Sequence, residues 1–89
     1  MARFELSESN HAVLGEGPVN DSTLLDLGMM YSVGRSVPID YVTAHKWFNL
    51  AAMQGNEDAV RLRQEIAAQM SETEISAAQR AARAWLRTN

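Results

Sequence analysis

The stretch of sequence that decides the fold is LGMMYSVGRSVPIDYVTAHKWFNLAAMQGNEDA, residues 27–59. Two apolar patterns with helical period lie on either side of a joint that contains Gly34 and Pro38. Glycine readily takes the left-handed conformation just after a helix, and proline is excluded from a helix interior. The stretch therefore predicts two helices that are joined by a short loop.

The first of these helices begins before the stretch, where Asp21 or Ser22 is a suitable N-cap. The second is capped by Asp40 and extends through Met53. The residues that recur on one face of each helix are predicted to face inward. They are Leu24, Leu27, Gly28 and Tyr31 in the first helix, and Tyr41, Ala44, Trp47, Phe48, Ala51 and Ala52 in the second, with Lys46 and Asn49 on the opposite side.

Gly28 lies on the inward face of the first helix, where a side chain is normally needed for the core. In an antiparallel pair it lies opposite Ala44 and Phe48 of the second helix. The missing side chain lets the two backbones approach closely around the aromatic ring. We therefore predict a tight antiparallel helix pair.

Two more helices are predicted in residues 56–89. Asn56 is a suitable N-cap for the third helix, and acidic residues in its first turn favour the helix macrodipole. Ser71 and Glu74 form a capping box at the start of the fourth. The predicted inward residues are Ala59, Leu62, Ile66 and Met70 in the third helix and Ile75, Ala78, Ala82 and Trp85 in the fourth. No segment has the pattern of a β-strand, so the predicted fold is all-α.

The composition fits one small domain. The chain has 89 residues, a formal net charge of −3 and no cysteine. These values exclude a disulfide framework and a thiolate metal site, and they do not fit a basic nucleic-acid binder. Residues 1–20 mix polar residues and glycine and are expected to form a mobile N-terminal arm. No apolar run is long enough for a signal peptide or a membrane span, so the expected location is the cytoplasm.

An ordered set of residues in and around the central stretch is similar to a known repeat: Leu27, Gly28, Tyr31, Gly34, Val37, Asp40, Tyr41, Ala44, Trp47, Phe48, Ala51, Ala52, Gly55 and Ala59. The set resembles the Sel-one-like repeat, a relative of the tetratricopeptide repeat that forms an α-hairpin and stacks into a solenoid. Ser36 stands where that family usually has a second loop glycine. The resemblance implies one full repeat at residues 21–55.

A weaker second copy follows in residues 56–89. Leu62 lies 35 positions after Leu27, but Arg63 replaces the notch glycine and the glycine loop is absent. The second copy therefore looks like a degenerate capping repeat. The resemblance implies a right-handed stack of two antiparallel helix pairs. It also implies a protein–protein adaptor, of a kind often found in bacteria, with no catalysis of its own.

The first predicted helix has a second apolar row, Leu25, Met29 and Val33, which its core face does not explain. In the repeat family this row belongs to the concave surface on which a partner lies, and the equivalent positions on the third helix are Val60, Gln64 and Ala67. We take Leu25, Met29, Val33, Val60 and Gln64 as the candidate partner-binding site for another protein or peptide. The same apolar row also fits a homodimer interface, which is the alternative hypothesis, or a face that the N-terminal arm of the same chain covers.

The other candidate sites favour structural roles. His11 and His45 lack the spacing of a metal pair on one helix, and His45 is expected at the edge of the helix pair. Arg80, Arg83 and Arg87 form a solvated face or a contact for an acidic partner. No catalytic constellation is visible, so we expect no cofactor, no metal, no nucleic acid and no membrane, and an enzyme is a remote alternative.

Overall fold

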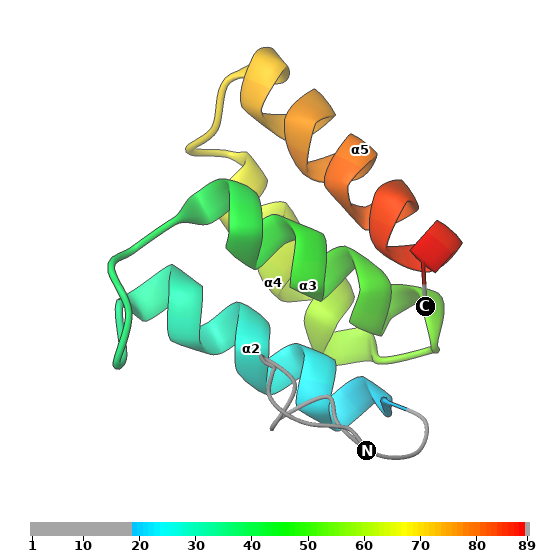
Figure 1. The fold of residues 1–89 in the computed structure, drawn as a ribbon. Coiled ribbons are helices and arrows are strands. Elements are labelled where there is room, and N and C mark those ends of the chain that lie inside the picture. The colour runs from blue at the N-terminus through cyan, green and yellow to red at the C-terminus, as the bar shows by residue number, and fades with distance from the viewer. Residues whose placement is uncertain (1–18, 89) are drawn as a thin grey trace, which may run out of the picture.

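The structure is a computed structural model that describes residues 19–88, and these residues form four helices and no strand. The helices are α2, Asp21–Val33; α3, Tyr41–Met53; α4, Glu57–Ala67; and α5, Glu72–Thr88 (Figure 1). The all-α prediction is confirmed for this range. The predicted arm, apart from Val19 and Asn20, lies outside the described residues.

Side chains at the starts of three helices form the predicted N-terminal caps. The carboxylate of Asp40 and the amide oxygen of Asn56 each accept a hydrogen bond from the N–H three residues later, at 3.1 Å and 2.8 Å. Ser71 Oγ accepts from the N–H of Glu74 at 3.1 Å, and Glu74 accepts from the N–H of Ser71 at 2.9 Å. These bonds satisfy N–H groups that have no partner inside the helix.

The first helix is capped one residue earlier than predicted. Its N-cap is Asn20, not Asp21 or Ser22. The amide oxygen of Asn20 accepts from the N–H of Thr23 and from the hydroxyl of Ser22, both at 2.9 Å. Asp21 lies instead in the first turn of α2, where its carboxylate accepts a hydrogen bond from the side chain of Asn56 at 2.9 Å.

The close approach of α2 and α3 is confirmed at Gly28. Gly28 and Phe48 are both buried. A Cβ at position 28 would overlap Cδ1 and Cε1 of Phe48 and would lie 3.0 Å from its Cγ. The aromatic ring thus fills the place of the missing side chain. The chain then leaves α2 through Gly34, which has the predicted left-handed conformation with φ 80° and donates its N–H to the carbonyl of Met30 at 2.9 Å.

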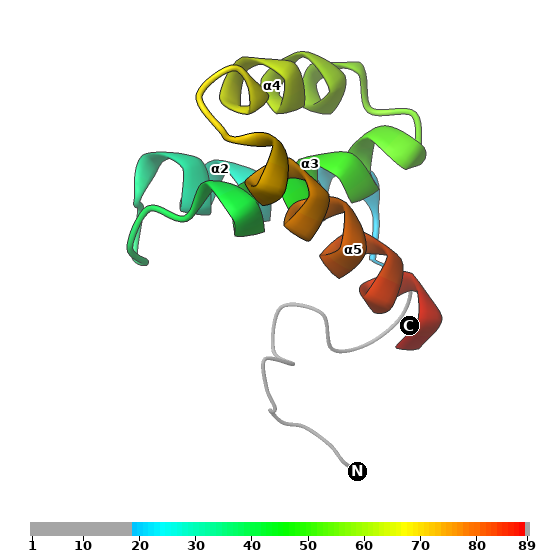
Figure 2. The same cartoon turned by 90° about the horizontal axis from the view of Figure 1, so that it is seen from above.

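α3 is the central helix of the described residues. α2, α4 and α5 each pack against α3, whereas the other pairs of helices make few contacts or none. Figure 1 shows α2 and α3 as an antiparallel pair, and Figure 2 shows α4 on one side of α3 and α5 crossing the other side. The pairing of α2 with α3 is as predicted. The predicted pairing of α4 with α5 does not form, so the right-handed stack of two antiparallel pairs is not confirmed.

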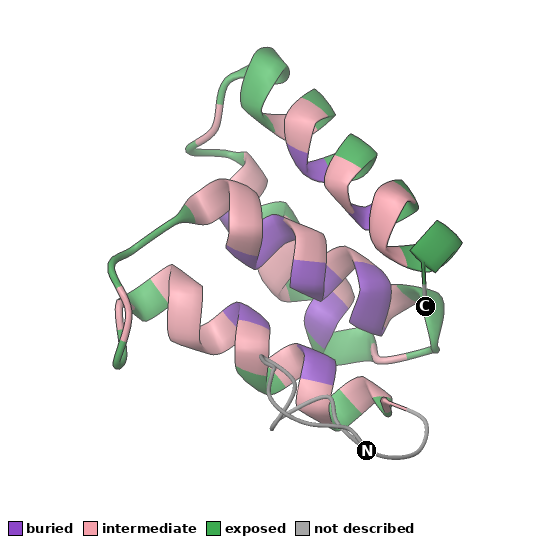
Figure 3. Cartoon of the chain, in the orientation of Figure 1, coloured by how far each residue is buried: buried purple, intermediate pink, exposed green. Residues whose placement is uncertain are grey.

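The core is built mainly on α3, whose buried residues are visible in Figure 3. The predicted inward residues Ala44, Trp47, Phe48 and Ala51 are buried, while Tyr41 and Ala52 are half-buried. His45 and Leu50 are also buried, at 3% and 2% exposure, although neither was predicted to face inward. The helical period predicts one buried face for each helix. Because α3 packs against three other helices, it buries side chains on more than one face.

The beginnings of α2 and α4 lie side by side. The side chain of Asn56 donates to Asp21 at 2.9 Å, and the side chain of Gln54 donates to the carbonyl of Val19 at 3.2 Å. Each bond joins residues that are 35 positions apart, which is the offset of the two predicted repeat copies. Asn56 therefore both caps α4 and fixes its start against α2.

We expect Asn56→Ala to lower the free energy of unfolding by about 2 kcal/mol, because it removes a helix cap and a half-buried hydrogen bond together. Asn20→Ala is the matched control, because it removes an exposed cap and should cost only about 1 kcal/mol. Urea titrations that follow the helical circular dichroism signal measure both values. Equal costs for the two variants would show that the Asn56–Asp21 bond does not stabilise the fold.

Candidate interaction surface

The predicted partner-binding row on α2 is open at one end and packed at the other. Val33, at the C-terminal end of the helix, is 58% exposed. Leu25 and Met29 are half-buried and pack against the core cluster. The row therefore combines one exposed apolar side chain with two half-buried ones that pack against the core.

The predicted residues on α4 have a similar division. Val60, in the first turns of α4, is half-buried, and Gln64, one turn later, is exposed. Because the Asn56–Asp21 hydrogen bond holds the first turns of α2 and α4 together, the two rows begin at the same end of the molecule. Each row becomes more exposed toward the C-terminal end of its helix.

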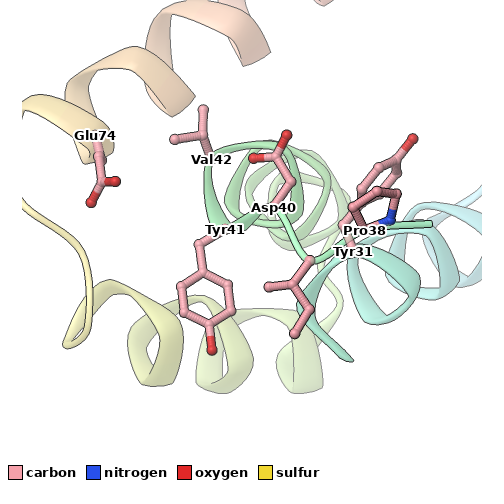
Figure 4. Close-up of a pocket in the computed structure, with 7 residues that line it drawn as sticks. Tyr31, Pro38, Asp40, Tyr41, Val42 and Glu74 are labelled. Carbon is pink, nitrogen blue, oxygen red and sulfur yellow. The ribbon is translucent and has the colours of Figure 1, made fainter. Parts of the chain in front are cut away.

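A depression lies at the opposite end of the helix pair, where the loop from α2 meets the start of α3 (Figure 4). Its volume is about 470 Å³, and its lining residues are Tyr31, Pro38, Ile39, Asp40, Tyr41, Val42 and Glu74. Ile39 is 59% exposed and so offers an apolar contact at the rim. Sequence reasoning missed this site, because Pro38 was read only as a helix breaker.

The two carboxylates of this depression already serve as helix caps. Asp40 accepts hydrogen bonds from the N–H and the hydroxyl of Thr43, at 3.1 Å and 2.8 Å. Glu74 accepts from the N–H of Ser71 at 2.9 Å. In Figure 4 the two carboxylates stand on different helices. Their hydrogen bonds are used within the two helix caps, and the lining supplies no histidine or cysteine to work with them.

His45 was expected at the edge of the helix pair, and this expectation is wrong. Its side chain is buried, and Nδ1 has no hydrogen-bond partner among the described residues. Burial is the main cause that lowers the pKa of His45, and the positive charge of Arg63 lowers it further, while a backbone contact within residue 45 opposes the shift. Arg63 itself donates a hydrogen bond of 2.6 Å to Asn49. The imidazole therefore lies near a cation, at the contact of α3 with α4.

The three arginines on α5 form an exposed row, as predicted. Arg80, Arg83 and Arg87 are all exposed and make no ion pair with another described residue. The ion pairs that residues 19–88 do contain join Arg61 to Asp58 at 3.3 Å and to Glu65 at 3.4 Å. The arginine row is therefore accessible, as a solvated face or a surface for an acidic partner.

Two kinds of site are not found within residues 19–88. No group of three or more histidine, cysteine or acidic side chains is placed to hold a metal ion. No described helix is both long enough and apolar enough to cross a membrane.

Comparisons of the chain with protein-family profiles, with curated proteins and with solved structures give no match. The observations support a small domain of four helices in the described residues, without a family assignment.

Proposed function

We propose that this chain is a small non-enzymatic interaction module that presents the exposed sides of α2 and α4 to another protein or peptide. The observation that carries the proposal is the second apolar row of α2, which ends in the exposed Val33. The core face of the same helix is already occupied, since Leu24 and Gly28 are buried. Exposed apolar residues beside a satisfied core face are typical of a contact surface.

We further propose that residues 21–55 are one Sel-one-like repeat and that residues 56–89 are a degenerate end unit. Three features of the α2–α3 pair support this relation: the notch of Gly28 against Phe48, the left-handed Gly34, and the cap at Asp40. The hydrogen bond from Asn56 to Asp21 supports the repeat offset, because it joins residues 35 positions apart at the starts of α2 and α4. In this proposal α4 and α5 each pack against α3 and form the end unit of the repeat structure.

The partner is a protein or a peptide segment that has an apolar side chain for the Val33 end of the row. Val33 is apolar, while Gln64 offers both a donor and an acceptor of hydrogen bonds. A mixed surface of this kind fits a reversible contact better than a permanent core. The proposal assigns no cofactor and no reaction to the chain.

We expect the double substitution Val33→Glu and Gln64→Glu to weaken partner binding at least tenfold, because it places carboxylates without partners in the contact. Both residues are exposed, so the free energy of unfolding should change by no more than about 0.5 kcal/mol. The measurement is the amount of each protein retained from source cells by the immobilised chain. The control is Arg80→Glu combined with Arg83→Glu, which reverses charge on α5. A partner that is lost with the control and kept with the α2–α4 variant would refute the proposed surface.

The homodimer is the second candidate, because the same row can pair with its copy. Light scattering over a concentration series distinguishes the two candidates. A dimer that disappears in Val33→Glu would assign the row to self-association. A monomer at every concentration would exclude the homodimer, and the row would then be assigned to a different protein or peptide.

A further inference from the structure

His45 is a buried ionisable side chain at the contact between two helices. It is 3% exposed, and it is the one buried polar side chain among the described residues. Its Nδ1 has no hydrogen-bond partner there. A neutral imidazole tolerates such a place, but a protonated imidazole is costly to bury without a partner for its charge.

The surroundings of His45 supply positive charge, and the one acceptor that acts on the imidazole belongs to its own backbone. Arg63 of α4 is the charged group that acts on the imidazole from across the contact. The acceptor one turn further along α3 is Asn49, and its oxygen already takes the 2.6 Å hydrogen bond from Arg63. No carboxylate of α2, α4 or α5 is among the groups that influence His45. A second positive charge at this position would therefore be repelled by Arg63, with only the contact to its own backbone in its favour.

α4 is the helix that can respond to this charge. It is the shortest of the four described helices, with 11 residues, and it packs mainly against α3. Its buried side chains are Ala59 and Ile66, and Leu62 also packs against the core. Because α5 likewise buries only Ala78 and Ala82, α4 is distinguished by Arg63, which faces His45, and not by weaker packing.

We propose that the packing of α4 against α3 is acid-sensitive, and that protonation of His45 releases α4 while α2, α3 and α5 remain packed. The release would separate Val60 and Gln64 of α4 from the apolar row of α2. Acid would therefore disrupt the interaction surface proposed above. The acid response itself does not depend on that surface. It is a property of His45 and its neighbours in the fold.

The direction of the pH effect follows from the lowered pKa of His45. The packed state favours the neutral imidazole, so the stabilisation is fully present above the ordinary histidine pKa of about 6.5. It is lost as the pH falls below that value. Because one proton is involved, the ratio of released to packed α4 should rise by at most about tenfold per pH unit.

Amide hydrogen exchange of the full chain between about pH 7.5 and pH 5.0 tests the proposal, since aspartate and glutamate titrate below this range. After correction for the intrinsic pH dependence of exchange, we expect protection in α4 to fall below about pH 6.5 while protection in α3 persists. His45→Gln should abolish this response. His11→Gln is the matched control and should retain it, because these are the two histidines of the chain.

A second measurement keeps the proposal testable if His45→Gln fails to fold. An NMR titration of the wild-type imidazole should place the His45 pKa below its ordinary value, and Arg63→Gln should move it upward. The proposal is overturned if α4 keeps its protection at about pH 5, if all helices lose protection together, or if His45 titrates at the ordinary value or above it.

Discussion

Gly28→Leu is expected to destabilise the domain by about 3 kcal/mol or more, the upper range for overpacking a filled core. The ring of Phe48 already occupies the volume that the first side-chain carbon would need. Phe48 is itself fully buried, so its ring cannot move aside without displacing its neighbours. Thermal unfolding followed by circular dichroism measures the loss.

Asp26→Leu is the matched control for this substitution, because it adds the same side chain at an exposed position of α2. It should change the free energy of unfolding by no more than about 0.5 kcal/mol. If Gly28→Leu melted at the temperature of Asp26→Leu, the close packing of α2 on α3 would be wrong.

Trp47→Ala is expected to cost about 3–5 kcal/mol, the usual range for the loss of a buried aromatic side chain. Trp47 is 7% exposed, and its ring packs edge-on against Trp85 with ring centroids 5.8 Å apart. The Nζ atom of Lys46 lies 4.1 Å from the centroid of the Trp47 ring, which adds a cation–π contact. The substitution therefore loosens both the core of α3 and the attachment of α5.

The indole N–H of Trp47 has no hydrogen-bond partner among the described residues. The substitution therefore removes packing and the cation–π contact but no hydrogen bond to another described residue. Trp47→Phe keeps an aromatic ring and removes the unpaired N–H, so it should cost less than about 1.5 kcal/mol. Urea titrations compare the two variants. If Trp47→Ala lowered the free energy of unfolding no more than Trp47→Phe does, the ring of Trp47 would not be central to the core.

The α2–α3 pair could be predicted from the sequence because its signals are local. A cap such as Asp40 and a helix end such as Gly34 depend on a few neighbouring residues, and the structure places both as predicted. Gly28 was informative because a glycine on the apolar face of a helix usually marks a close approach of another element. The first cap was missed by one residue, since Asn20, Asp21 and Ser22 all have suitable side chains.

The positions of α4 and α5 could not be predicted from the helical period. The period identifies an apolar face, as it did for Ala59 and Ile66 of α4 and for Ala78 and Ala82 of α5, all of which are buried. It does not say which neighbour that face meets. Both helices meet α3 instead of each other.

The candidate surface was only partly predictable for the same reason. Leu25, Met29 and Val33 share a face by spacing, but their exposure depends on the elements that surround them. Leu25 and Met29 proved half-buried, while Val33 proved exposed. The burial of His45 arises in the same way, because α3 is enclosed on more than one side.

Site-specific photocrosslinking in source cells tests the proposed interaction surface most directly. A photoreactive residue is placed at Val33 or at Gln64, and at Arg83 on α5 as the comparison position, all three of which are exposed. We expect the same partner, or a second copy of the chain if the homodimer is correct, to be captured from positions 33 and 64 and not from 83. Capture from position 83 with none from 33 and 64 would contradict the account and assign the contact to the arginine row.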